Sequence, residues 1–168
     1  ANDSGISAVL EDEGRFLGSI DFQERVWREY PDTAEVVSGY FALSQLLYQK
    51  APKAHELPKE DNLQPEKIAM LKRTVDMLLS FLALYPTDPL ADDAGFSLCN
   101  GMLDLKDYPM VVSLSREFTK RHAESELAPG FQYMTALGLF WQNQFGEALA
   151  AARVVADGES KDRDFARY

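Results

Sequence analysis

Residues 85–94 read YPTDPLADDA, and shorter versions of this phrase occur twice more in the chain. One is YPDT at residues 30–33, and the other is the degenerate HAESELA at residues 122–128. The phrases begin 55 and 37 residues apart, and the spacing of 37 recurs between Tyr108 and Phe145. A spacing that recurs at separate positions is typical of repeat proteins, so we expect the chain to be built from repeats.

The longer spacing equals one period of 37 residues plus an insertion of 18. We assign the surplus to residues 51–65, APKAHELPKEDNLQP, which contain three prolines and little hydrophobic periodicity. Proline lacks an amide donor and disfavours helix in the residue before it. This proline-rich stretch is therefore predicted to be an inserted loop.

When the repeats are aligned on the first residue of each phrase, residues of similar size fall at the same positions. Fourteen positions after that residue the side chains are small: Ser44, Cys99 and Ala136. Large apolar side chains recur at helical spacing in three other columns: Phe16, Leu71, Tyr108, Phe145; Val26, Phe81, Phe118, Val155; and Leu47, Met102, Leu139. Each repeat is therefore predicted to be a pair of amphipathic helices that cross closely at the small residue. Cys99, the one cysteine, is interpreted as a small buried hydrophobe rather than a reactive thiol.

The pattern predicts an all-α chain of about seven helices, without strands of useful length. The predicted helices span residues 7–30, 33–50, 66–85, 90–105, 109–121, 126–143 and 145–156, and residues 160–168 look like the start of an eighth. The first predicted helix is the second of a pair, and the chain stops inside the first helix of another pair. Because repeat arrays end in specialised terminal repeats, we expect residues 1–168 to be a single repeat domain that is a fragment of a longer protein.

The charge balance narrows the range of partners. The chain carries 27 acidic and 17 basic side chains, a net charge of −10. Such a charge repels phosphate backbones and anionic lipid surfaces, so no nucleic acid is expected as a partner. The richest apolar stretch, residues 77–85, is about half of the ~18–20 residues that a membrane helix needs, so no membrane insertion is expected.

The columns resemble the tetratricopeptide repeat. Leu137-Gly138 and residues 145–148, FGEA, resemble the signatures of its two helices, and Pro31 and Pro86 match its closing proline. The period of 37 residues exceeds the usual ~34 and, with the Tyr-Pro phrase, is similar to repeats of bacterial cell-envelope proteins such as the TolA-binding periplasmic coordinator and the outer-membrane-assembly lipoprotein. The resemblance implies a right-handed superhelical stack of antiparallel helix pairs, an α-solenoid. It also implies a periplasmic or cell-envelope location, with a cytoplasmic one left open.

Residue types that carry catalysis or bind metals are sparse and badly spaced. His55 begins a zinc-protease-like motif but lacks its second histidine, and His122 is expected to pack at a helix end. Ser113 and Ser115 have no histidine in register for nucleophilic catalysis. Asp107 is expected to cap the helix that follows it. No catalytic residue, metal site or cofactor is therefore predicted, and the chain is not expected to be an enzyme.

In a curved stack of helix pairs, the first helices line the concave face. By the resemblance, aromatic side chains of these helices would face that groove and anchor another protein or a peptide. The candidate partner-binding residues are Tyr48, Phe96, Tyr133, Phe140 and Trp141. The alternative is that the aromatic column of Phe41 and Phe96 belongs to the core. The sequence thus favours a protein-interaction scaffold, and the alternative is a structural spacer in a multidomain enzyme whose chemistry lies elsewhere.

Overall fold

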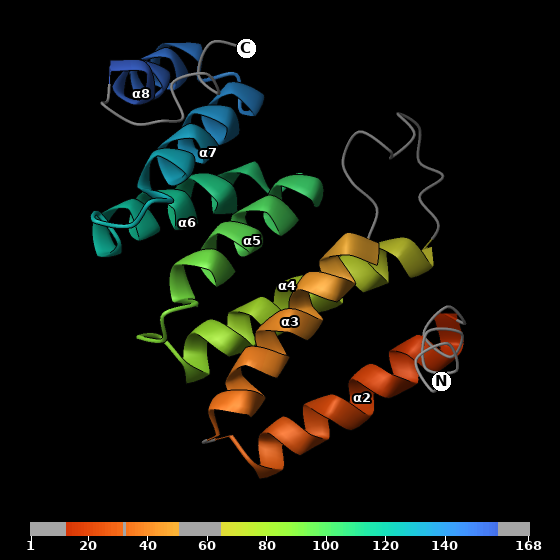
Figure 1. The fold of residues 1–168 in the computed structure, drawn as a ribbon. Helices are drawn as coiled ribbons and strands as arrows, with labels where there is room; N and C mark the ends of the chain where they lie inside the picture. Colours follow the sequence, from red (N-terminus) through yellow and green to blue (C-terminus); the bar gives the residue numbers. More distant parts are fainter. Residues whose placement is uncertain (1–12, 32, 51–64, 158–168) are drawn as a thin grey trace, which may run out of the picture. The chain divides into compact units, whose positions relative to one another are not determined.

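The computed structural model describes residues 13–31, 33–50 and 65–157, which form helices joined by turns without any strand (Figure 1). The seven helices of these ranges are α2 (Glu13–Glu29), α3 (Ala34–Lys50), α4 (Pro65–Leu84), α5 (Ala91–Asp104), α6 (Tyr108–Arg121), α7 (Ala128–Trp141) and α8 (Phe145–Asp157). From α3 onward every boundary lies within two residues of the predicted one, so the all-α prediction is confirmed. The start of the first predicted helix, most of the proline-rich loop and the start of an eighth helix lie outside the described residues.

The chain divides into two compact units, Ala1–Leu43 and Ser44–Tyr168. In the first unit, α2 and the beginning of α3 meet through Trp27 and Tyr40, whose ring centroids are 4.0 Å apart. The second unit contains the end of α3 and all of α4 to α8, and from α4 onward each helix packs on the next one along the chain (Figure 1). None of the helices described combines the length and hydrophobicity required to cross a membrane.

The period of 37 residues is visible in the helices of the second unit. Both ends of α7 lie 37 residues after those of α5 (128 − 91 and 141 − 104), and α8 begins 37 residues after α6 (145 − 108). The turns between paired helices also match, because Lys106 and Asn143 both have a φ of 61°. The amide that follows each, that of Asp107 or Gln144, donates to a carbonyl oxygen five residues earlier, at 2.9 and 3.0 Å. α5 and α7, the first helices of their pairs, therefore end in the same left-handed cap.

The repeated phrases form the turns that lead from one pair to the next. Asp88 Oδ1 accepts a hydrogen bond from the amide of Leu90 at 2.9 Å, and 37 residues later Ser125 Oγ accepts one from the amide of Leu127 at 3.0 Å. Asp and Ser side chains commonly close turns in this way. The two phrases thus fold alike, although they share few residues.

The core lies along the predicted columns. The small residues Ser44, Cys99 and Ala136 are buried, as expected for positions where two helices cross closely. Phe131 of α7 packs against Phe96 of α5 with the ring centroids 5.5 Å apart, and against Phe118 of α6 at 5.1 Å. One aromatic ring thus joins three helices, and aromatic contacts of this kind contribute about 0.5–1.5 kcal/mol beyond the buried area.

Gly138 marks a close crossing of α7 with α6 and provides a test of this packing. A Cβ there would lie 2.8 Å from Val112 Cγ2 and 3.3 Å from the carbonyl oxygen of Tyr108. We expect Gly138→Ala to lower the free energy of unfolding by about 1–3 kcal/mol because α6 and α7 must move apart. In the control Gly146→Ala the added methyl group meets no atom within 4 Å, so stability should stay constant or rise by up to about 1 kcal/mol. Urea unfolding measures both, and equal effects would contradict the close crossing.

Candidate functional site

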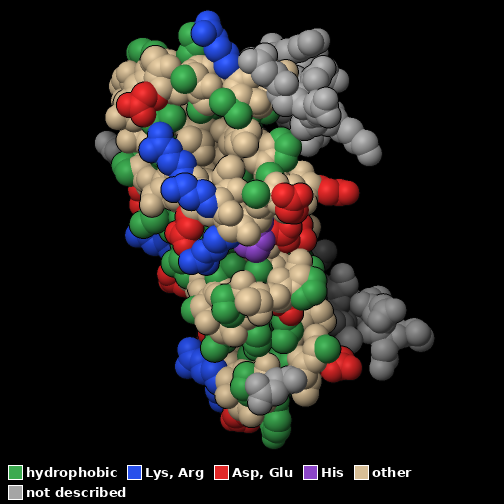
Figure 2. Space-filling view, turned by 90° about the vertical axis from the view of Figure 1, so that its left-hand side faces the viewer, with side chains coloured by type: hydrophobic (Ala, Val, Ile, Leu, Met, Phe, Trp, Pro, Cys, Tyr) green, Lys and Arg blue, Asp and Glu red, His purple; other side chains and the backbone are tan. Residues whose placement is uncertain are grey.

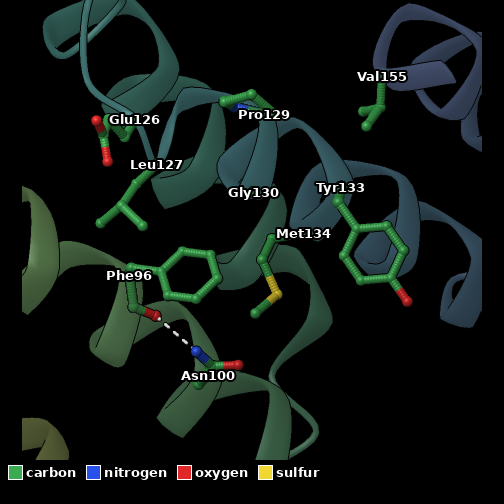
Figure 3. A pocket seen from close by; sticks show the side chains of 9 residues that line it. All are labelled: Phe96, Asn100, Glu126, Leu127, Pro129, Gly130, Tyr133, Met134 and Val155. Carbon is green, nitrogen blue, oxygen red and sulfur yellow. Dashed lines mark hydrogen bonds between the residues drawn. The ribbon is translucent and has the colours of Figure 1, made fainter. Parts of the chain in front are cut away.

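A pocket of about 380 Å³ opens beside the first helices α5 and α7. Its walls are mostly apolar, and its lining residues are Phe96, Asn100, Glu126, Leu127, Pro129, Gly130, Tyr133, Met134 and Val155. Figure 3 shows Phe96, Leu127 and Met134 pointing toward one another, while Val155 enters from α8. A concave, mostly apolar site with few polar groups is the usual form of a binding pocket.

Two of the five predicted partner-binding residues, Phe96 and Tyr133, line this pocket. They lie 37 residues apart and occupy the same position on α5 and α7. Phe96 also packs edge-on against Phe131 with a centroid distance of 5.5 Å, so it serves the core and the pocket at once. Tyr133 is half-buried, and its hydroxyl is directed away from the pocket (Figure 3).

Tyr48 of α3 lies apart from the pocket. Its hydroxyl donates a hydrogen bond to Asp104 Oδ2 on α5 at 2.9 Å. Burial, followed by the nearby Asp104 carboxylate and this hydrogen bond, raises the pKa of Tyr48 above its ordinary value. A neighbouring hydrogen bond of 2.6 Å joins Gln45 Nε2 to Ser97 Oγ, so this part of α3 is tied to α5 by polar contacts. The Tyr48 phenol thus already holds two helices together.

Phe140 and Trp141 belong to a second group of aromatic residues, at the turn between α7 and α8. Trp141 stacks on Tyr108 with the centroids 5.9 Å apart, and Phe140 meets both Trp141 and Phe145 at 5.6 Å. The side chains remain well exposed, at 49% for Phe140, 52% for Trp141 and 56% for Phe145. Exposed large apolar side chains that cluster in this way are typical of interaction surfaces. We call Tyr108, Phe140, Trp141 and Phe145 the aromatic cluster.

The sequence did not identify the other pocket residues. Met134 and Leu127 carry no pattern that distinguishes them from core residues. Val155 belongs to the same column as Phe118, and it lines the pocket together with Tyr133. A second hollow of about 360 Å³, lined by α6, α7 and α8 and edged by Arg116 and Lys120, was also not expected from the sequence.

Ser115, Asp107 and His122 make structural contacts in the second unit. Ser115 and Thr135 share a buried hydrogen bond of 2.7 Å between α6 and α7. Asp107 Oδ1 accepts from the amide of Met110 at 3.2 Å and caps α6, as predicted. His122 ends α6 and stacks on Phe118 at 5.4 Å, also as predicted. Figure 2 shows acidic and basic side chains close together on one face of the molecule, and Arg121 pairs with Glu117 at 2.6 Å. Among the described residues, no three His, Cys, Asp or Glu side chains could together hold a metal ion.

Cys99 is fully buried, and burial raises the pKa of its thiol from about 9 to about 12. We therefore expect the native protein to resist thiol reagents at mildly alkaline pH and to react fully once unfolded, because the thiolate is the nucleophile. Between these two pKa values the folded chain keeps a proton that the unfolded chain loses, so this group makes stability fall as the pH rises through that window. Labelling of native protein as fast as that of denatured protein would contradict the assignment.

The hydrogen bond between Tyr48 and Asp104 predicts a selective effect of removing one hydroxyl. Tyr48→Phe should lower the free energy of unfolding by about 1.5–3 kcal/mol, since it removes a hydrogen bond to a charged acceptor. Tyr133→Phe is the matched control, because its hydroxyl is directed away from the pocket; its effect should stay within about 0.5 kcal/mol. Equal effects of the two variants in urea unfolding would show that the bond to Asp104 contributes little.

Comparisons with known proteins found no match for this chain. No family model matches the chain, and neither the curated proteins nor the solved structures gave a match. The assignment of repeats therefore rests on the 37-residue period and on the packing that follows it.

Proposed function

We propose that this chain is a non-catalytic scaffold of the tetratricopeptide type, which binds a peptide or helix of another protein along its first helices. The pocket beside α5 and α7 is the observation that carries the proposal. It contains Phe96 and Tyr133, the aromatic residues that the repeat register places at the same position of successive first helices. An apolar pocket with aromatic walls suits an apolar side chain of a partner.

The aromatic cluster supports the same function. Phe140 and Trp141 expose about half of their surface, although exposed aromatic residues cost solubility unless a partner uses them. Aromatic side chains are enriched among the residues that dominate binding energy at interfaces. The net charge of −10 favours a partner without a strong negative charge of its own.

We further propose that successive pairs build a right-handed superhelical stack. Two observations support this: the pair α7 and α8 follows the pair α5 and α6 at an offset of 37 residues, and the first helices α5 and α7 contact each other. A constant step between identical units generates a superhelix with one extended concave surface. The resemblance to bacterial cell-envelope repeats adds a periplasmic or envelope location to the proposal.

A comparison of alanine variants tests the scaffold function. We expect Tyr133→Ala and Trp141→Ala each to weaken binding of a purified partner, obtained by pull-down with the whole parent protein, by about tenfold or more. Leu84→Ala is the control, because Leu84 is 56% exposed on α4 and lies outside both the pocket and the aromatic cluster. Calorimetry reports the dissociation constant, and thermal unfolding should change little. Variants that lose stability but bind the partner normally would argue against a binding role.

A further inference from the structure

Lysine and arginine are distributed unevenly between the first and second helices of the pairs. Among the described helices, the second helices carry ten of them, three each on α2, α4 and α6 and one on α8. The first helices α3, α5 and α7 carry only Lys50, the last residue of α3. Acidic residues show no such bias, because six of these seven helices contain Asp or Glu. Carboxylates close to α5 and α7 are therefore not offset by a cation of the same helix.

The pocket beside α5 and α7 has carboxylates at one edge. Residues 85–105 and 122–144, which contain both helices and the turns before them, include six Asp and Glu residues and neither Lys nor Arg. Glu126 lines the pocket, is exposed, and forms no ion pair within the described part of the chain. The neighbouring Ser125 hydroxyl donates a hydrogen bond to Asp92 Oδ2, which places a second carboxylate close to Glu126. We call Asp92 and Glu126 the acidic edge of the pocket.

None of the cations on α6 or in the turn after α5 lines this pocket. Arg121 pairs with Glu117 at 2.6 Å on α6 itself, and Arg116 pairs with Glu147 of α8 at 3.5 Å. Lys106 follows the end of α5 that is opposite Asp92. The cations of α6 are thus paired with residues of second helices or, as with Lys120, line the second hollow.

We propose that the pocket binds a cationic segment of another protein, in which one apolar side chain is flanked by lysine or arginine. The apolar side chain enters beside Phe96 and Tyr133, and the flanking cations lie against the acidic edge. The inference rests on the proposed scaffold function and specifies the charge and the anchor of its partner. Charge complementarity selects this occupant, because opposite charges speed association and fix register whereas like charges repel.

Three short peptides with blocked termini test this recognition in the full chain. The probe has phenylalanine between two lysines on each side; the second peptide has alanine in place of the phenylalanine, and the third has glutamate in place of every lysine. We expect the probe to shift the NMR signals of Phe96, Gly130 and Tyr133 saturably, and the other two to bind at least about fivefold more weakly. No binding of the probe, binding of either other peptide with equal affinity, or shifts confined to other residues would overturn the proposal.

Two charge reversals separate the acidic edge from the net charge of the chain. Glu126→Lys should weaken binding of the probe at least about fivefold, because it replaces an attraction by a repulsion. Asp76→Lys is the matched control: it changes the net charge equally, but Asp76 is exposed on the second helix α4 and does not line the pocket, so affinity should stay within about twofold. Equal affinities of the two variants would overturn the proposal. Raising the salt concentration from about 50 to about 500 mM should weaken the probe more in the unchanged protein than in Glu126→Lys.

The chain's own residues 158–168, which lie outside the described residues, are not selected by charge. They include Phe165 and Tyr168, but their three acidic and three basic side chains give no net charge. A protein with both Phe165→Ala and Tyr168→Ala should therefore bind the probe within about twofold of the unchanged protein. A marked increase in affinity would show that the chain fills its own pocket and would overturn binding of a separate protein.

The scaffold function is distinguished by its own partner. If Tyr133→Ala and Trp141→Ala weaken binding of that partner while Glu126→Lys does not, the scaffold function holds and the preference for a cationic segment fails. If Glu126→Lys weakens the probe but both alanine variants bind the partner normally, the charge preference of the pocket holds and the proposed scaffold function fails.

Discussion

The insertion of Phe131 between Phe96 and Phe118 is the contact on which the second unit depends. A single helix pair leaves part of its apolar surface exposed, because its two helices bury only the faces that they turn toward each other. The first helix of the next pair covers this remaining apolar surface, and one of its aromatic rings is at the centre of the contact. Glycines make room for this arrangement: a Cβ at Gly95 would collide with the ring of Phe118, and one at Gly130 would lie 2.8 Å from Phe96. Large and small residues must therefore change together across three helices, which explains why they recur at a fixed period.

Most of the fold could be predicted because every repeat must match large and small side chains across neighbouring helices. The small column of Ser44, Cys99 and Ala136 predicted the close crossings, and the proline-containing phrases predicted where helices end. The turns could be compared even where their residues differ, since Asp88 and Ser125 make equivalent hydrogen bonds. In the first unit the columns include Phe16 and Val26 of α2, but they did not indicate the contact of Trp27 with Tyr40, whose ring centroids are 4.0 Å apart.

The candidate site could be predicted only in part. Periodicity states which residues occupy equivalent positions, but it does not state what covers each position. Tyr48, Phe96 and Tyr133 were grouped as groove residues, yet the phenol of Tyr48 bonds to Asp104 while Phe96 and Tyr133 share a pocket. Val112 and Leu149 are equivalent in the sequence and differ in exposure because α7 covers only the former. A hydrophobic pattern records neither side-chain cover nor cavity volume, so it did not predict the pocket of about 380 Å³.

Exposed apolar side chains of α8 link binding to stability in this chain. Leu149 and Phe145 of α8 each expose more than half of their surface, and a partner bound against them would bury both side chains. A ligand that binds only the folded chain stabilises it in proportion to the logarithm of its concentration relative to its dissociation constant. α8 would gain most, because among the described helices it packs chiefly on α7. The same apolar contacts would thus contribute to recognition and to the stability of the folded chain.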